Sequence, residues 1–477
     1  MTPWHNDPIA DPQSEIIYLR DDETGEIWTP TPLPLRETQP YRVSHGQGWS
    51  MYEHESHGIA QELQVFVALK DPVKLAVLRL TNQSSRPRNL SVTHFAEWVL
   101  GSVREQQQLH VATSYHASGV LLARQSWNST FEGLVAFSSV SPAPTSFMAD
   151  RISFFGSASG HVPVALRSGG LNGRCGPLLD PCTALQVKVS IPPGETLEIV
   201  FVLGQTESEE RAVDLAQRYR SPDRAHDELN AVREWWGGKL ETVQVACPCA
   251  TIDAMLNGWL LYQVLACRVW ARSGTHQSGG AFGFRDQLQD CVALVYAAPD
   301  LTRAHLLRAA ARQFRAGDVQ HWWHPETGLG VRTRCSDDLL WLPWAVARYI
   351  ERTQNTGILD EQVTFLEGPE LALGEQEKLF AANSSHETAT LLEHCRLAIE
   401  HAFQLGPHGI PLFGNGDWND GMNRVGSEGR GESVWLGWFL LDILRDWTGL
   451  IRHTNPPQAA VWDSRGATLK EALEREA

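Results

Sequence analysis

The first 205 residues alternate between apolar and polar positions in short runs. The clearest runs are residues 63–69, 74–80, 90–95, 185–191 and 197–203. Alternation with a period of two places the apolar side chains on one face of a β-strand. Segments rich in Asn, Ser, Pro and Gly separate the runs and favour turns. Many short strands at this spacing predict a large β-sandwich over residues 1–205.

After Gly204 the apolar positions recur at intervals of three and four residues instead. Residues 206–245 are rich in charged side chains and predict a helical linker. Residues 246–477 contain longer amphipathic segments, which are joined by loops rich in Gly, Trp and Asp. Alternating helices with polar loops at one end predict an α/α toroid.

Three of the expected helices have a clear apolar face. Their apolar positions are Met255, Leu256, Trp259, Leu260, Leu265 and Val269 in the first, Leu306, Leu307, Ala310 and Phe314 in the second, and Leu391, Leu392, Cys395 and Ile399 in the third. We expect the third helix to begin near Ser385, as its N-cap, and to end at Gly406. Residues 469–477 continue a helical pattern without a stop signal, and fewer helices are expected than a closed double ring needs. We therefore expect a toroid that is truncated at its C-terminus.

The overall composition is that of a globular protein without a nucleic-acid partner. The apolar fraction is 42%, the charged fraction is 20% and the net charge is −16, whereas nucleic-acid binding needs a basic face. No apolar run approaches the ~20 residues of a membrane helix, and the N-terminus lacks the basic and apolar regions of a signal peptide. Among the eight cysteines, Cys247 and Cys249 have no second pair that would complete a zinc motif. We expect reduced thiols in a cytoplasmic protein that has no membrane segment of its own.

The 18 tryptophans admit two interpretations. A Trp ring packs against the C–H face of a sugar while its N–H group reaches a hydroxyl group. Alternatively, the tryptophans fill an aromatic core. Composition alone leaves both interpretations open.

The first polar loop precedes a helix and places two carboxylates on one helix face. Residues 278–284 are rich in glycine, which lets the backbone approach a ligand closely. Asp286 and Asp290 lie four residues apart, so they share a helix face and could accept hydroxyl groups of a sugar. Alternatively, Asp286 caps the helix. Arg268 and Arg272 on the preceding helix could bind an anion or only solvate a helix end.

The second polar loop combines aromatic, imidazole and carboxylate side chains. His321 and His324 flank two tryptophans, but no third ligand stands at a familiar spacing, so no metal site is predicted. Asp337 and Asp338 precede an apolar helix that contains Trp341. These two carboxylates either cap the helix or bind hydroxyl groups.

The third polar loop, residues 414–423, carries the main catalytic candidate. It holds Asp417, Trp418, Asn419 and Asp420 between glycines. Asp and Asn are also common in ordinary turns, which is the alternative. A general acid must retain its proton near neutral pH, and apolar or like-charged surroundings favour the protonated form of a carboxyl group. We therefore expect Asp420, beside Trp418 and Asp417, to be the catalytic acid.

Together the three loops resemble the cellobiose-phosphorylase family, glycoside hydrolase family 94. The motifs occur in the family's order as Gly-Phe-Arg285-Asp286-Gln-Leu-Gln-Asp290, Asp337-Asp338-Leu-Leu-Trp341 and Gly416-Asp417-Trp418-Asn419-Asp420. Residues 18–30, 54–58, 317–323 and 429–438 are similar to the phosphorylase-like domain of cyclic β-1,2-glucan synthases. The resemblance extends over essentially the whole chain.

The resemblance implies a fold in three parts. These are a galactose-mutarotase-like β-sandwich over residues 1–205, a helical linker over residues 206–245 and the first half of an (α/α)6 catalytic barrel over residues 246–477. The family's sandwich begins before the position that matches Met1, so we expect truncation at the N-terminus as well. The chain is further expected to act as a homodimer or within a larger synthase of the inner membrane.

The resemblance also implies roles for single residues. Asp420 matches the general acid, Trp418 matches a wall of the glucose subsite and Asp286 matches a ligand of glucose hydroxyl groups. The remaining expected substrate-binding residues are Arg285, Asp290, Asp337, Asp338 and Trp341. Arg268 is the expected phosphate ligand, and the other phosphate ligands belong to the second half of the family's barrel. Where cellobiose phosphorylases have a glucose-binding Arg six residues before Asp286, this chain has Gly280, so its subsite or linkage preference differs.

The expected activity is inverting phosphorolysis of a β-linked glucan, or the reverse synthesis. The expected substrates are β-1,2-glucan oligosaccharides and inorganic phosphate, with no cofactor. A phosphorylase needs one carboxylate because phosphate is the nucleophile, whereas an inverting hydrolase needs a second one to activate water. One alternative is an inverting glucan hydrolase with Asp337 or Asp338 as the base. The other is a non-catalytic glucan-binding or inert remnant of a synthase.

Overall fold

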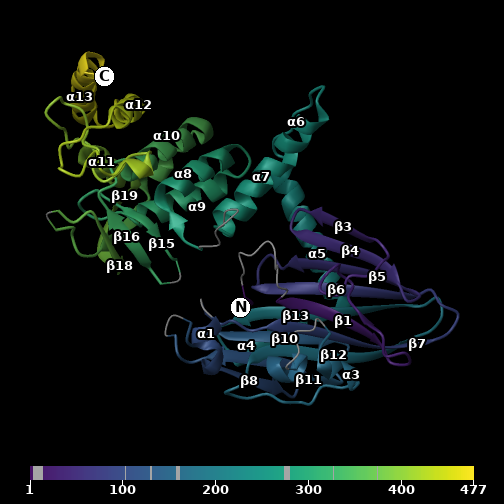
Figure 1. Cartoon of the computed structure of the whole chain (residues 1–477). Helices are drawn as coiled ribbons and strands as arrows, with labels where there is room; N and C mark the ends of the chain where they lie inside the picture. Colours follow the sequence, from purple (N-terminus) through teal and green to yellow (C-terminus); the bar gives the residue numbers. More distant parts are fainter. Residues whose placement is uncertain are drawn as a thin grey trace. The chain divides into compact units, whose positions relative to one another are not determined.

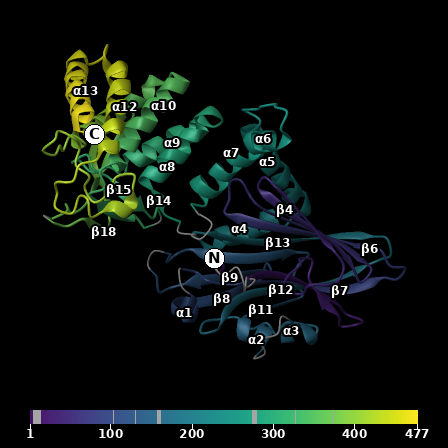
Figure 2. The same ribbon diagram turned by 45° about the horizontal axis from the view of Figure 1, so that its top comes forward.

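The computed structural model describes residues 1–3, 14–101, 104–128, 131–156, 162–272, 280–325, 327–372 and 374–476 (Figures 1 and 2). The chain forms two compact units, Met1–Gly238 and Lys239–Ala477. Antiparallel sheets build the first unit, and helices build most of the second. No helix among the described residues has the length and apolar character needed to cross a membrane. All eight cysteines are free thiols.

The first unit contains a five-stranded and an eight-stranded sheet. The strands are β1 (Glu15–Asp21), β2 (Ile27–Trp28), β3 (Tyr41–Gly46), β4 (Trp49–Ser56), β5 (Ile59–Val67), β6 (Val73–Asn82), β7 (Arg88–Glu97), β8 (Val111–His116), β9 (Val120–Gln125), β10 (Val135–Ser141), β11 (Ser146–Asp150), β12 (Pro181–Ile191) and β13 (Thr196–Thr206). The strand orders are β11-β12-β7-β1-β2 and β3-β4-β5-β6-β13-β10-β9-β8, and neighbouring strands are antiparallel. The five alternating runs of the sequence form β5, β6, β7, β12 and β13, which confirms the predicted sandwich.

The core of the first unit lies between its two sheets. Val92 and Leu185 of the five-stranded sheet share a buried cluster with Leu78 and Phe201 of the eight-stranded sheet. Each apolar side chain of this size contributes about 1.5–3 kcal/mol when it is removed from water. The apolar positions of the alternating runs therefore hold the two sheets face to face.

Helices follow the last strand of the sandwich. They are α4 (Glu209–Tyr219) and α5 (Pro222–Leu240), whereas α1 (Arg104–Gln107), η1 (Gln108–His110), α2 (Arg151–Phe155) and α3 (Val164–Arg167) are short helices within the sandwich sequence. Helix α4 begins at an N-cap, Ser208, whose side chain accepts the N–H group of Arg211 at 3.2 Å. Helix α4 packs on β10 and β13. The boundary between the two units falls within α5, inside the segment predicted as a linker.

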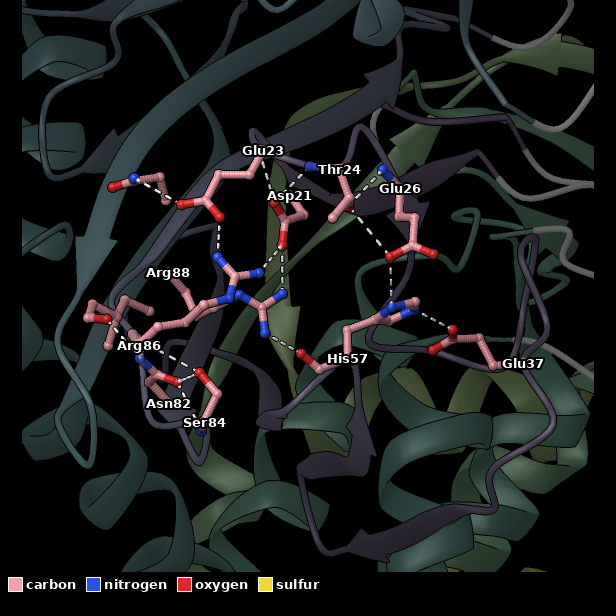
Figure 3. Close-up of polar contacts among 12 residues, drawn as sticks. Asp21, Glu23, Thr24, Glu26, Glu37, His57, Asn82, Ser84, Arg86 and Arg88 are labelled. Atoms are coloured by element: carbon pink, nitrogen blue, oxygen red, sulfur yellow. Dashed lines mark hydrogen bonds and ion pairs between the residues drawn. The ribbon is translucent and has the colours of Figure 1, made fainter.

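A buried ion pair joins three turns of the sandwich (Figure 3). Asp21, at the end of β1, accepts the backbone N–H groups of Glu23 and Thr24 at 2.8 and 3.1 Å. Arg88, at the start of β7, contacts the other oxygen of Asp21 and also donates to the backbone carbonyl of His57 in the β4–β5 turn. Burial opposes ionisation of Asp21, but the N–H groups and the Arg88 guanidinium hold its pKa below the usual value. The ionised pair is therefore the state that stabilises these turns.

A second carboxylate, Glu37, attaches the segment between β2 and β3 to the same region. It accepts from Nε2 of His54 at 2.8 Å and from Nε2 of His57 at 2.6 Å. The His57 ring stacks on Trp28, and the His54 ring stacks on Tyr41. These contacts join residues of the segments 18–30 and 54–58, and both segments therefore contribute to the packing of the sandwich.

The second unit consists of helices around two small sheets. Its helices are α6 (Ala250–Ala254), η2 (Met255–Trp259), α7 (Leu260–Gln263), η3 (Val264–Trp270), α8 (Phe284–Ala293), η4 (Leu294–Tyr296), α9 (Pro299–Ala310), η5 (Asp338–Leu340), α10 (Trp341–Thr353), η6 (Thr356–Asp360), α11 (Leu391–His401), η7 (Asp420–Met422), α12 (Val434–Ile451) and α13 (Pro456–Glu476). Its strands are β14 (Phe282–Gly283), β15 (Gln320–Trp323), β16 (Leu329–Thr333), β17 (Gln362–Glu367), β18 (Glu377–Ala381) and β19 (Asn383–Thr390). Helix α10 contacts α8, α9, α11 and α12, so it lies at the centre of the helical core.

The predicted helices are present, but some of their details were wrong. Helix α11 begins at Leu391 and is capped by Thr390, because Ser385 belongs to β19, and it ends at His401 instead of Gly406. Helix α9 ends at Ala310, so Phe314 lies outside it. The helix over residues 250–270 buries Leu265 and Val269, whereas Met255, Leu256, Trp259 and Leu260 are exposed.

We predict that Asp21→Ala destabilises the first unit by about 3 kcal/mol, because it leaves the buried charge of Arg88 unpaired. The matched control is Glu23→Ala. It removes a half-exposed carboxylate that pairs with the half-exposed Arg86 and should cost less than about 1 kcal/mol. Calorimetric unfolding of the full chain at several pH values would measure both changes.

The effect of Asp21→Ala should be complete above about pH 4, the usual pKa of an aspartate. It should diminish as the pH falls toward the lowered pKa of Asp21, because a protonated Asp21 no longer pairs with Arg88. Equal losses in the two variants, or a loss that does not vary with pH, would contradict a stabilising buried pair.

Candidate active site

The second and third polar loops are joined through their backbones. Ser336 donates its N–H group to the carbonyl of Gly416 at 2.9 Å and its hydroxyl to the carbonyl of Phe413 at 2.9 Å. Gly414 has φ +66°, and a Cβ atom there would lie 1.9 Å from the carbonyl oxygen of Arg334. Only glycine permits this approach. The carboxylates that follow Ser336 and Gly416 are therefore held close to one another.

Arg285 is the cation on which these carboxylates converge. It lies in the first turn of α8 and is only 7% exposed. Its Nη2 donates to both oxygens of Asp420 at 2.9 Å, and its Nη1 donates to the carbonyl of Asp417 at 3.2 Å. Nη1 also lies 3.4 Å from Oδ2 of Asp337. Burial disfavours the charge of Arg285, but Asp337, Asp420 and Asp338 raise its pKa above the usual value.

Asp337 is buried and orders the side chains around it. Its Oδ2 accepts the indole N–H group of Trp341 at 2.9 Å, and its Oδ1 accepts the thiol of Cys335 at 3.3 Å. Burial and the neighbouring Asp338 raise the pKa of Asp337 to about 6, although Trp341 and Arg285 favour its charge. Asp337 is thus an internal anchor for Arg285 and Trp341, not a surface group. It stands at the N-cap of η5 but makes no side-chain cap bond.

Asp338 forms a separate ion pair with His321. Nδ1 of His321 lies 2.7 Å from Oδ2 of Asp338, which is buried. His321 lies on β15, where the pairing with β16 shifts register between Gln320 and Trp322. Such a bulge redirects a side chain. Burial lowers the pKa of His321, but Asp338 outweighs burial and raises the value to about 9.

His321, Cys335 and Asp338 also form the one group of potential metal ligands found among the described residues. One ligand atom of each lies within 4.8 Å of the others. Burial and the carboxylates of Asp338 and Asp337 raise the pKa of the Cys335 thiol above its usual value. In this geometry the thiol donates to Asp337 and the imidazole pairs with Asp338, so both ligands are already engaged.

Asp420 and Trp418 present the open face of the site. The Asp420 side chain is 65% exposed although Arg285 binds both of its oxygens. Trp418 is 51% exposed and stacks on Trp435 with their ring centroids 6.4 Å apart. Trp435 also lies 6.4 Å from the ring of Trp341. An exposed carboxylate beside an exposed indole face is an arrangement suited to a sugar ring.

Asp417, the other carboxylate of this loop, has a structural role. Its Oδ1 accepts the backbone N–H group of Asn419 at 2.8 Å, as in an ordinary Asx turn. Its Oδ2 accepts the hydroxyl of Ser433 at 2.6 Å, and Ser433 is the N-cap of α12. An ordinary turn therefore accounts for Asp417. It does not account for Asp420, whose side chain is exposed.

The carboxylates of the first polar loop are arranged differently. The N-cap of α8 is Gly283, so the alternative in which Asp286 caps this helix was wrong. Asp286 is 55% exposed and reaches no closer than 4.0 Å to Nε of Arg285. Asp290 pairs with Nε of Arg268 at 2.9 Å, and burial raises the pKa of Asp290 although Arg268 opposes that rise. Residues 273–279, including part of the glycine-rich approach, lie outside the described residues.

The structure thus brings together most of the residues predicted for the site. One connected group comprises Arg285, Asp337, Trp341, Trp418 and Asp420, and Asp338 adjoins it. Arg268 and Asp290 form a separate pair. Sequence reasoning missed Trp435, Ser433 and the pairing of His321 with Asp338. Trp435 and Ser433 could have been found from the motif at residues 429–438, in which Ser433 precedes an apolar helix.

A cavity of about 580 Å³ lies beside the Cys335 segment. Cys335, Ser336 and Gly414 contribute to its wall, but Arg285 and Asp420 do not. The open face that carries Asp420 and Trp418 is therefore separate from this cavity.

Two family models together match nearly the whole chain. Residues 1–222 match the supersandwich domain of glycosyl hydrolase 94, and residues 235–477 match the catalytic domain of the glycosyl hydrolase 94 superfamily. The chain is 38% identical, over its entire length, to the cyclic β-(1,2)-glucan synthase NdvB of Rhizobium meliloti (strain 1021), but it spans only 17% of that protein.

Further similarities agree with a sandwich domain followed by a catalytic domain. The chain is 28% identical to the solabiose phosphorylase of Paenibacillus borealis over 92% of the chain and 55% of that protein. Among solved structures, a bacterial glucoamylase complexed with acarbose matches 96% of this chain and 61% of its own, with a TM-score of 0.57 and 8% identity. At that identity the likeness concerns the fold alone. It confirms a β-sandwich followed by a helical catalytic domain.

We predict that Gly414→Ala loosens the junction between the two loops. Its matched control is Gly429→Ala, because Gly429 has a similar φ of +71° but open space around the new Cβ. The control should cost about 1–2 kcal/mol from backbone strain. Gly414→Ala should cost about 1–3 kcal/mol more, because its Cβ also meets the Arg334 carbonyl.

Hydrogen exchange of the Ser336 amide, which donates to Gly416, reports on this junction directly. Its protection should fall in Gly414→Ala and persist in Gly429→Ala. Equal protection in the two variants would show that the close backbone approach does not hold the loops together.

Proposed function

The chain belongs to glycoside hydrolase family 94, and we propose that it cleaves β-glucosidic bonds by inverting phosphorolysis with Asp420 as the general acid. One observation carries this proposal: Asp420 is an exposed carboxylate bound by a buried arginine and placed beside an exposed tryptophan. Phosphate attacks the anomeric carbon on the face opposite the leaving oxygen, and the glycosidic bond breaks. Asp420 gives its proton to the leaving oxygen. The products are α-glucose 1-phosphate and a shortened glucan.

The burial of Asp337 and Asp338 favours phosphorolysis over hydrolysis. An inverting hydrolase needs a second carboxylate that can activate a water molecule. Asp337 is committed to Arg285, Trp341 and Cys335, and Asp338 is committed to His321. Neither carboxylate has an exposed oxygen surface for such a water. Phosphate, which brings its own nucleophilic oxygen, removes the need for a base.

The protonation of Asp420 requires a change at Arg285. An oxygen that carries a proton for the leaving group cannot also accept a hydrogen bond from Nη2 through the same lone pair. Nη2 contacts both oxygens. A proton on the lone pair that faces Nη2 displaces one of these contacts, while the other keeps Asp420 in position.

We propose β-1,2-glucan as the substrate. The 38% identity over the whole chain to a protein named as a cyclic β-(1,2)-glucan synthase supports this choice. Gly280 stands where cellobiose phosphorylases have a glucose-binding arginine, and glycine has no side chain that could reach a sugar hydroxyl. We therefore infer that the subsite differs from that of cellobiose phosphorylases. Asp286, exposed near Arg285, is assigned to hydroxyl groups of the cleaved glucose unit.

Phosphate is the proposed co-substrate, and no cofactor is needed for this chemistry. The solabiose phosphorylase among the relatives supports phosphate as the nucleophile. Arg268 remains the proposed phosphate ligand within this chain. Its guanidinium is half-exposed, and among the residues that the structure describes only its Nε is engaged, by Asp290. Its terminal nitrogens are therefore the groups that we assign to an anion.

We expect Asp420→Asn to lower the rate of glucose 1-phosphate release on the order of 10²–10⁴-fold, because an amide cannot donate the acidic proton. The control Glu428→Gln changes an exposed carboxylate that pairs with the exposed Arg430 in the same loop, and it should leave the rate unchanged. The assay uses the natural protein that carries this sequence, with β-1,2-linked glucose oligosaccharides and phosphate. A near-normal rate in Asp420→Asn would exclude Asp420 as the acid, and release of free glucose without phosphate would identify a hydrolase.

We expect Asp286→Ala to lower kcat at least as strongly as it raises KM. The reason is that hydroxyl contacts at the cleaved sugar strengthen as the ring flattens toward an oxocarbenium ion. Steady-state kinetics on the same oligosaccharides separate the two parameters. A raised KM with unchanged kcat would place Asp286 at a more distant subsite.

A further inference from the structure

The turn at Asp337 and Asp338 holds a second cation that the phosphorolysis proposed above does not use. Asp338 is 1% exposed, and Nδ1 of His321 lies 2.7 Å from its Oδ2. The other oxygen of Asp338 is buried without a partner among the described residues. His321 is therefore the main stabilising partner of a buried carboxylate, and removing its charge would leave Asp338 uncompensated.

His321 is linked to Asp420 through the other charged groups of the site. Its partner Asp338 adjoins Asp337, and Asp337 contacts Arg285, which binds Asp420. Burial and Arg285 oppose a charge on the imidazole, whereas Asp338 and Asp420 favour it, and the balance raises its pKa to about 9. The ring is therefore an imidazolium near neutral pH, with a proton on each nitrogen. The titratable and charged groups around it are Asp338, Asp420, Arg285, Cys335 and Asp337.

The second nitrogen of His321 has no hydrogen-bond partner among the described residues. Nδ1 is used by Asp338, whereas Nε2 is not buried. The side chain is 30% exposed. A ring that a buried carboxylate fixes at one nitrogen thus leaves its other N–H donor accessible to a ligand.

We propose that His321 is a sugar-binding residue whose Nε2–H donates a charge-assisted hydrogen bond to a hydroxyl group of the glucose unit bound against Asp420. This inference rests on the proposed function and adds a residue to the same site. Asp338 is then a positioning residue, because it fixes the ring and its charge without touching the sugar.

The charges of the site favour a hydroxyl group over an anion as the ligand of His321. Asp337, Asp338 and Asp420 outnumber the two cations Arg285 and His321. A phosphate at His321 would meet this excess of negative charge, whereas a neutral hydroxyl group would not. A metal ion would have to displace the proton of Cys335, which burial and both carboxylates retain.

The charge on His321 is tested without any ligand. In the full chain with ¹³C-labelled histidine, the His321 resonance is identified by its loss in His321→Asn and followed by NMR against pH. We expect a titration near pH 9. Asp338→Asn should shift it below the ordinary value of about 6.5, because burial and Arg285 then outweigh Asp420, the carboxylate that still favours the charge. A midpoint near 6.5 in the unaltered chain would overturn the ion pair as described.

The role of His321 is tested by calorimetric titration with a β-1,2-linked glucose oligosaccharide. His321→Asn should weaken binding on the order of 10- to 100-fold, as expected for one charge-assisted hydrogen bond. The matched control is His324→Asn on the same hairpin, since the His324 ring contacts Trp322 and should not affect binding. Affinity of the unaltered chain should fall above about pH 9, whereas that of His321→Asn should not. Melting temperatures of both variants show whether the fold is kept.

The possible outcomes separate this inference from the function on which it rests. Equal affinity in the unaltered chain and His321→Asn overturns the role of His321 alone. Failure of the unaltered chain to bind the oligosaccharide overturns both the hydroxyl ligand and the proposed function. Titrations with orthophosphate and with zinc chloride complete the test, because a His321-dependent binding of either ion identifies the wrong ligand class here.

Discussion

The buried charge of Arg285 is the constraint on which the geometry of the site depends. A guanidinium removed from water is stable only when carboxylate and carbonyl oxygens accept its N–H groups. Those acceptors lie on two loops that are 52 and 135 residues away along the chain, at Asp337 and at Asp420. Both loops must therefore close onto α8, and the glycine at position 414 permits their backbones to approach. Because Arg285 binds Asp420 from the protein side, the acid is fixed in position while most of its side chain stays exposed.

Two adjacent buried carboxylates are tolerated at this site because each has its own cation. Asp337 is matched by Arg285 and Asp338 by His321, so neither charge is left without a partner. Even so, burial and the neighbouring Asp338 raise the pKa of Asp337 to about 6. A ligand that enters beside Asp420 adds least electrostatic cost when it is neutral. The hydroxyl groups of a glucan satisfy this condition, and the proposed phosphorolysis would have phosphate approach from the side of Arg268.

The sequence predicts the elements better than the site. Alternating apolar and polar residues predict strands at β5, β6, β7, β12 and β13, and the sandwich follows from their number and spacing. The pattern does not predict that polar side chains of β7, such as Ser91 and His94, are buried as well. Ser385 was mistaken for a helix cap because Ser and Thr serve both caps and strands, and only the pairing of β19 with β17 distinguishes the two. The tryptophans divide between both interpretations: Trp28, Trp98 and Trp447 are buried, whereas Trp418 is exposed. The pairing of His321 with Asp338 could not be found from local spacing, because it depends on a β-bulge and on a loop 17 residues away.

The distribution of exposure among the acidic residues argues for a nucleophile that the protein does not supply. Asp337, Asp338 and Asp417 are buried and engaged with side chains of the same unit, and they therefore shape the site without reaching solvent. Asp420 and Asp286 are the exposed carboxylates that lie against Arg285 among the described residues. If Asp286 binds hydroxyl groups, one exposed carboxylate remains, and it can protonate a leaving oxygen but cannot also activate water on the opposite face of the sugar. The proposed phosphorolysis fits this distribution, because phosphate is an oxygen nucleophile that is already anionic and needs no second carboxylate.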